Sequence, residues 1–198
     1  MTGTDQAQPK KKTRVCPWWL AYTFDNPLRR MVHPPEKILG DYVWEGMQVL
    51  DIGCGFGHFT IGLARLVGPS GRVTALDLQE QMLRKTMSRA KKRGVADVVQ
   101  PKLSNGDDLG QANSFDFVLA SNVLHEVPDQ AVLIAQVAVV LKPEGLFYIM
   151  EPFGHVKIQD FEKEIGLCRA AGLLEVTRPK VKRERCVLVQ KPGQEKVT

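Results

Sequence analysis

Residues 49–57 hold the clearest chemical pattern of the chain: an apolar run that ends in an acid, followed by three glycines at alternate positions. The apolar run is typical of a buried parallel strand, and Asp51 stands near its end. Gly53, Gly55 and Gly57 let the chain turn sharply and let a ligand lie against bare backbone. An apolar helix pattern follows, so the segment predicts a ligand site at the carboxyl end of a parallel strand.

The glycine spacing argues against a dinucleotide as that ligand. The dinucleotide fingerprint would place its third glycine at position 58, where this chain has His58. Asp51 also brings a negative charge to the place where a pyrophosphate would lie. A ligand with a cationic centre and hydroxyl groups suits these residues better.

Residues 49–57 resemble motif I of the class I methyltransferases that depend on S-adenosylmethionine (SAM), and later motifs follow in that family's order over residues 36–190. The resemblance implies SAM as the cofactor. It implies a Rossmann-like, doubly wound α/β fold, with a mostly parallel seven-stranded sheet whose last strand is antiparallel. It also implies that the cofactor lies on the loop after the first strand, at Asp51, Gly53, Cys54, Gly55 and Gly57.

Asp77 ends the predicted second strand, 26 residues after Asp51. An acid at this place, beside the glycine turn, can accept hydrogen bonds from both ribose hydroxyls, as it does in the family. Leu78 follows and is expected to line the adenine slot. The alternative is a solvated aspartate at a strand end.

Asp107 and Asp108 follow the predicted third strand. In similar methyltransferases, an acid at this place accepts a hydrogen bond from the adenine amino group. We favour Asp107 over Asp108 for this contact. The alternative is a cap for the short segment that follows.

The loop at residues 120–129 resembles the loop that follows the fourth strand of small-molecule methyltransferases. The resemblance places Asn122 and His125 beside the methionine part of the cofactor and the substrate. A neutral histidine can take a proton from a hydroxyl or amine near pH 7. Alternatively, a loop carbonyl satisfies His125, and alignment of the nucleophile suffices for methyl transfer.

The same loop argues against two classes of DNA methyltransferase. Amino-methylating DNA enzymes carry an Asn/Asp-Pro-Pro-Tyr/Phe motif here, whereas Asn122 is followed by Val-Leu-His. The Pro-Cys pair of cytosine C5 methyltransferases is also missing from the loop. Nucleic acid is therefore a possible but not a favoured partner.

Three further candidates lie at ends of predicted elements. Glu151 and His155 follow the predicted fifth strand, at the sheet edge where the substrate is expected, so either contacts substrate or merely belongs to a strand-to-helix connection. His58, at the start of the first helix, either binds the methionine carboxylate or caps the helix in solvent.

The elements that must position these residues alternate between strand and helix, which favours a parallel α/β sheet. Strands are predicted at residues 72–78, 96–103, 114–120, 146–150, 173–178 and 185–190, and helices at 79–93, 129–141 and 158–171. Residues 142–145 are predicted to stop a helix and turn the chain. The last two strands are predicted to form a hairpin because their connection is short.

One domain is expected for 198 residues. Residues 1–15 are predicted to be a disordered basic arm. Residues 16–40 are aromatic-rich and predict either a lid over the core or ordinary edge packing. Residues 41–190 are predicted to be the methyltransferase domain, and residues 191–198 a tail.

Composition is that of an ordinary globular protein, with 43% hydrophobic and 25% charged residues and a net charge of +5. The cysteines, Cys16, Cys54, Cys168 and Cys186, lack metal or disulfide spacing and predict free thiols in the cytoplasm. The histidines are not spaced as ligands on one element, so no metal is predicted. No apolar stretch is long enough for a bilayer span, and a monomer or homodimer without a membrane partner is expected.

The predicted function is methyl transfer from SAM to a small-molecule acceptor, giving S-adenosylhomocysteine. Three alternatives stay open. The basic arm and the basic cluster at residues 178–185 favour an RNA or protein methyltransferase. Cys16 and Cys54 suggest methylation of a thiol or a metalloid. A non-catalytic SAM-binding subunit would keep the same cofactor residues.

Overall fold

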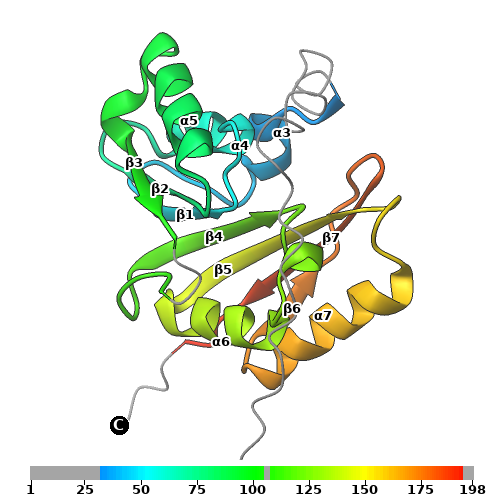
Figure 1. Ribbon diagram of the computed structural model, residues 1–198. Coiled ribbons are helices and arrows are strands. Elements are labelled where there is room, and N and C mark those ends of the chain that lie inside the picture. Colours follow the sequence, from blue (N-terminus) through cyan, green and yellow to red (C-terminus); the bar gives the residue numbers. More distant parts are fainter. Residues whose placement is uncertain (1–31, 105–107, 194–198) are drawn as a thin grey trace, which may run out of the picture.

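The computed structural model of the chain describes residues 32–104 and 108–193 (Figure 1). The predicted basic arm, the aromatic part of the entry segment up to residue 31, and residues 194–198 of the predicted tail lie outside this part. Asp107 also lies outside it.

One seven-stranded sheet has the order β3-β2-β1-β4-β5-β7-β6. The strands are β1 Gln48–Ile52, β2 Arg72–Asp77, β3 Val99–Leu103, β4 Phe115–Ser121, β5 Leu141–Pro152, β6 Leu174–Thr177 and β7 Glu184–Gln190. Strands β1 to β5 pair in parallel, and β7 runs antiparallel to both β5 and β6. The predicted fold class is confirmed. The strand order reverses between β1 and β4, which is where ligands bind in open sheets of this type.

Helices cover both faces of the sheet (Figure 1). They are α3 Pro35–Leu39, α4 His58–Val67, α5 Glu80–Lys92, α6 Gln130–Val140 and α7 Ile158–Ala170, with short 3₁₀ turns η1 Ala96–Val98 and η2 Leu124–Glu126. No helix of the described residues is both long enough and apolar enough to cross a membrane.

Strand β4 contributes side chains to the core on both faces of the sheet. Phe117 and Leu119 belong to the buried cluster that includes residues of α3, α4 and α5, whereas Val118 and Ala120 belong to the cluster with α6 and α7. Successive side chains of a strand point to opposite faces, so the apolar run at residues 117–120 is buried on both sides. The well-packed sheet therefore holds the loops at its carboxyl edge in defined positions.

Two predicted elements were wrong in detail. Residues 96–98 form η1, and the third strand begins only at Val99. Residues 142–145 were predicted to be a turn, but they lie inside β5, whose register with β4 shifts between Phe115 and Phe117. The backbone N–H of Glu144 donates to the carbonyl of Lys191, and the N–H of Lys191 donates to the carbonyl of Gly145, both at 2.9 Å. These hydrogen bonds hold residues 142–145 in the strand as a local irregularity.

Candidate functional site

The glycine turn after β1 has left-handed backbone at all three glycines, with φ of 65° at Gly53, 54° at Gly55 and 77° at Gly57. A Cβ at Gly53 would lie 2.5 Å from the Val123 side chain, and one at Gly57 would lie 2.8 Å from Thr86. A Cβ at Gly55 would meet nothing within 4 Å. Two glycines thus permit close packing, while the third leaves bare backbone facing a space that a ligand can fill.

Asp77 holds this turn in place from the end of β2. Its carboxylate accepts a hydrogen bond from the backbone N–H of Gly55 (3.0 Å) and another from that of Gln79 (2.9 Å). Desolvation raises the pKa of Asp77, and hydrogen bonds from the backbone of Gln79, Gly55 and Leu78 oppose the shift. A carboxylate offers about four acceptor sites, so Asp77 retains capacity for a ligand hydroxyl.

Three other predicted cofactor residues surround the turn. Asp51 is 2% exposed, and its carboxylate accepts a hydrogen bond of 2.6 Å from the Thr60 hydroxyl. His58 bonds through Nε2 to the carbonyl oxygen of His33 (2.8 Å), which ties the start of α4 to the segment before α3. Leu78 is exposed directly after Asp77 and offers apolar surface beside that acid.

Of the two acids predicted to contact adenine, only Asp108 lies in the described part of the chain. Its carboxylate accepts hydrogen bonds from the backbone N–H of Gly110 (2.8 Å) and from the Lys102 ammonium (3.3 Å). The hydrogen bond from Gly110, followed by the contact with Lys102, lowers the pKa of Asp108. Asp108 therefore stabilises its own turn in this structure, and the adenine contact stays a prediction.

The loop after β4 contains polar atoms that the protein does not satisfy. Asn122 has a φ of 59° and donates its backbone N–H to the carbonyl of Met150 (2.7 Å). Its Oδ1 atom, and the hydroxyl of Ser121, are buried and have no hydrogen-bond partner among the described residues. Buried polar atoms are normally paired, so this place suits a polar ligand. Val123, packed against Gly53, brings the loop next to the glycine turn.

His125 and Glu151 form a hydrogen-bonded pair between the imidazole Nδ1 and one carboxylate oxygen. Glu151 is fully buried, and its other oxygen accepts the backbone N–H groups of Leu124 (2.8 Å) and Val123 (3.2 Å). The hydrogen bond to Glu151 raises the pKa of His125, against an opposing effect of desolvation. A buried, fully engaged carboxylate thus fixes the orientation of the imidazole.

The third predicted catalytic residue, His155, lies beside this pair. Its ring meets that of His125 edge-on, with 5.9 Å between the ring centroids. His155 is exposed, whereas His125 is half-buried. The structure therefore brings His125, Glu151 and His155 together. The sequence predicted each of them separately, and the only signal for their contact was that each follows one of two adjacent parallel strands.

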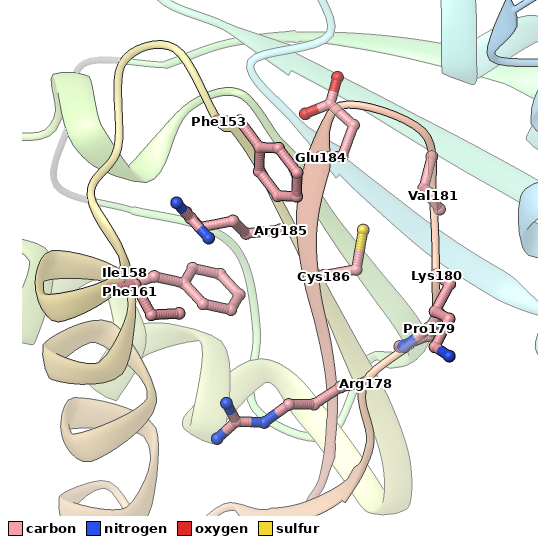
Figure 2. A pocket seen from close by; sticks show the side chains of 10 residues that line it. All are labelled: Phe153, Ile158, Phe161, Arg178, Pro179, Lys180, Val181, Glu184, Arg185 and Cys186. Carbon is pink, nitrogen blue, oxygen red and sulfur yellow. The ribbon is translucent and has the colours of Figure 1, made fainter.

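An open pocket of about 260 Å³ lies next to the segment after β5 (Figure 2). The sequence did not predict it. The Arg185 guanidinium stacks over the Phe153 ring at 4.5 Å and donates a hydrogen bond of 2.9 Å to the carbonyl of Val156. Apolar and charged side chains of both signs share the lining: Phe153, Ile158, Phe161, Arg178, Pro179, Lys180, Val181, Glu184, Arg185 and Cys186.

Residues 32–104 and 108–193 contain three cysteines, which are free and buried. No group of three or more histidine, cysteine or acidic side chains in this part of the chain is arranged to hold a metal ion.

Comparison with known proteins places this chain in a family. A family model described as a methyltransferase domain matches residues 44–182. The demethylmenaquinone methyltransferase of Staphylococcus aureus is 38% identical over 120 residues, which cover 59% of this chain and 48% of the relative. The chain thus spans about half the length of the curated relatives it matches.

Two solved structures support the fold. A SAM-dependent methyltransferase from Aquifex aeolicus has a TM-score of 0.77 at 25% identity, covering 89% of this chain and 98% of that one. The cyclase SpnF has a TM-score of 0.69 at 17% identity, covering 83% and 82%. At that identity, SpnF shows the fold alone.

The matched residues 44–182 include the glycine turn, Asp77, the loop after β4 and Glu151, which are the parts that this structure assembles into one site. The open backbone at Gly55, the spare acceptor capacity of Asp77 and the unsatisfied Asn122 oxygen all fit a ligand with hydroxyl and amino groups. The chain belongs to the methyltransferase-domain family.

Proposed function

We propose that this protein transfers the methyl group of SAM to a small-molecule acceptor that loses a proton as it is methylated. The observation that carries this proposal is the His125–Glu151 pair at the carboxyl edge of the sheet. Val123 links that pair to the glycine turn, because it packs on Gly53 and donates its N–H to Glu151. A base and a cofactor loop are therefore held in one rigid unit.

Four residues are the proposed holders of the cofactor. Asp77 would accept the ribose hydroxyls, and the bare backbone at Gly55 would lie against the ligand. Ser121 and Asn122 would gain partners for their buried oxygens. When bound, the cofactor supplies a methyl group on a positively charged sulfur, which is an intrinsically reactive donor.

In the proposed mechanism, His125 is the general base. Because Glu151 accepts the Nδ1–H hydrogen bond, the lone pair of the neutral ring lies on Nε2, and Nε2 takes the proton from the acceptor. The imidazolium that forms is stabilised by Glu151 and by Glu126, whose carboxylate lies 4.0 Å from Nε2. His125 thus removes the proton that the acceptor loses as it is methylated.

A small acceptor is favoured over RNA or protein for two reasons. The named acceptor of the staphylococcal relative is demethylmenaquinone, a small molecule. In addition, part of the basic cluster is already engaged: Arg178 is paired with Glu162 and Glu175, and Arg185 stacks on Phe153. Paired cations offer little net charge to a phosphate backbone.

Thiol or metalloid methylation is less well supported. Desolvation, followed by repulsion from Asp51 and Asp77, raises the pKa of Cys54 well above its ordinary value. A buried thiol that stays protonated is a poor nucleophile or ligand. Cys16, the other cysteine of that hypothesis, lies outside the described residues.

A non-catalytic subunit is the remaining alternative, because the fold alone does not fix the reaction. The similarity to the cyclase SpnF illustrates the point. Catalysis is favoured here because Glu151 is completely buried, and burying a carboxylate costs free energy. A subunit that only binds SAM would not need this buried acid beside His125.

The proposed function is tested by incubating the full chain with SAM labelled in the methyl group and with separate metabolite and RNA pools. We expect label in the metabolite fraction and formation of S-adenosylhomocysteine. Label in RNA alone, or cofactor binding without transfer to any pool, would contradict the proposal.

The Asp77→Ala variant is predicted to bind SAM about 1.5–3 kcal/mol more weakly, or about 10- to 150-fold. Two ribose hydroxyls lose a charged acceptor, and the N–H of Gly55 loses its partner. Isothermal titration calorimetry measures the change. Asp129→Ala is the matched control, because Asp129 only caps α6 through the N–H of Val132. The Asp129→Ala variant should have a lower melting temperature and an unchanged affinity for SAM. If both variants bound SAM equally well, Asp77 would not be the residue that binds the ribose.

The pH dependence of methyl transfer is predicted to report the His125–Glu151 pair. The base acts when neutral, so kcat/KM should rise with pH through a pKa above the ordinary histidine value of about 6.5. Glu151→Gln removes the charge that favours the imidazolium, so the rising limb should shift to lower pH while the plateau falls about 10- to 100-fold. An unchanged limb in this variant would show that His125 is not the titrating base.

A further inference from the structure

Glu164 of α7 is a buried acid that the proposed mechanism does not use. Its side chain is 1% exposed, and its Oε1 atom accepts a hydrogen bond of 3.1 Å from the side-chain amide of Gln130. The same amide group donates a second hydrogen bond, of 2.9 Å, to the carbonyl of Leu124. Glu164 is thereby connected to η2, the turn that carries His125.

The turn is held from two sides by two buried acids. On one side, Glu151 accepts the backbone N–H of Leu124 and the Nδ1 hydrogen bond of His125. On the other side, Gln130 binds the Leu124 carbonyl and is itself held by Glu164. Both hydrogens of the Gln130 amide group are used, so this bridge depends on an acceptor at position 164.

The surroundings of Glu164 disfavour a negative charge on it. Its Oε2 atom is buried and has no hydrogen-bond partner within the described part of the chain. The negative charges of Glu151 on β5 and Asp160 on α7 oppose the ionisation of Glu164, whereas His125 on η2 favours it. Glu164 in turn raises the pKa of Cys168 on the same helix. Burial, followed by repulsion from Glu151, raises the pKa of Glu164 to about 8. An ionised oxygen without a donor is costly in such a place.

We propose that Glu164 is a positioning residue for His125: it is protonated at neutral pH, and through Gln130 it holds the turn that carries the imidazole. The kinetic consequence rests on the proposed function, in which His125 is the base. The protonation state and the hydrogen-bonded bridge do not rest on it. When Glu164 ionises, a second negative charge joins Glu151, so His125 holds its proton more tightly.

The protonation is tested by ¹³C NMR of the glutamate carboxyl groups in the full chain, titrated from pH 4 to 9, with Glu164→Gln used to assign the signal. We expect the Glu164 carboxyl to titrate with a midpoint near pH 8. The His125 ring signal should sense the same step, and it should lose that step in Glu164→Gln. A midpoint near 4.3, the value of an ordinary glutamate, would overturn the proposal.

The positioning role is tested with Glu164→Leu, which keeps bulk but removes the acceptor of Gln130. We expect kcat to fall about tenfold or more with the KM for SAM unchanged, because misplacing the base leaves cofactor binding intact. Glu164→Gln keeps an acceptor oxygen and should recover most of the loss. Glu162→Gln, on the exposed side of the same helix, is the control for activity. Equal losses in the Leu and Gln variants, or none in either, would contradict the proposal.

These measurements separate this inference from the proposed function. The two NMR titrations need no methyl acceptor, so they decide the state of Glu164 even if no acceptor is methylated. Conversely, an active enzyme whose Glu164 titrates as an ordinary glutamate would overturn the inference alone.

Discussion

Replacing His125 by alanine is expected to lower kcat for methyl transfer by about 10²- to 10⁴-fold, the range that a positioned general base contributes. The buried Glu151 carboxylate would lose its imidazole partner, and the acceptor would have to lose its proton to water. The affinity for S-adenosylhomocysteine, measured by calorimetry, should change little, because the contacts proposed for the cofactor lie on other residues.

A second histidine variant sharpens this test. His155 is exposed and meets His125 only through its ring edge, so His155→Ala should cost much less in kcat. If His125→Ala retained full activity with a normal circular dichroism spectrum, alignment of the acceptor would be sufficient for transfer. The His125–Glu151 pair would then be a structural contact.

The sequence was most informative where a local residue pattern has a single structural explanation. Alternating glycines after an apolar run predicted the turn, and the structure gives all three of them the left-handed backbone that glycine permits. The apolar run before these glycines predicted a buried parallel strand, and residues 49–52 of β1 are indeed buried between the parallel strands β2 and β4. These features are local, so no knowledge of distant contacts was needed.

The errors arose where distant partners decide the local structure. Residues 142–145 contain proline and glycine and have the composition of a turn, yet hydrogen bonds between Lys191 and both Glu144 and Gly145 hold them in the sheet. Lys191 is 46 residues beyond Gly145 in the chain, so no local pattern could show this pairing. Long-range contacts override local propensity in strands more readily than in helices.

The same limit applies to the candidate site. The sequence placed His125 after the fourth strand and Glu151 after the fifth but could not show that they touch. Glu164 gave no signal at all, because a glutamate within a helix is usually solvated. It became significant only because the packing of α7 against the sheet buries it, where Gln130 supplies its hydrogen bond.

Gly55→Val is expected to reduce SAM binding by more than about 100-fold while the protein stays folded, because a side chain would enter the space proposed for the ligand. A Cβ at Gly55 meets nothing within 4 Å, so the substitution creates no clash inside the protein. The remaining cost is backbone strain at a φ of 54°, about 1–2 kcal/mol. Calorimetry measures the affinity, and thermal unfolding measures the strain.

Gly94→Val isolates the strain from the ligand effect. Gly94, just beyond α5, has a φ of 71°, and a Cβ there also meets nothing within 4 Å. Both variants should therefore lose similar stability, but only Gly55→Val should lose SAM. If both bound SAM normally, the turn after β1 would not be the cofactor site. If both lost it, general destabilisation would account for the loss. Both positions have left-handed backbone and open space around the added side chain. A difference in SAM affinity between the two variants therefore measures the effect of a side chain in the space next to Gly55.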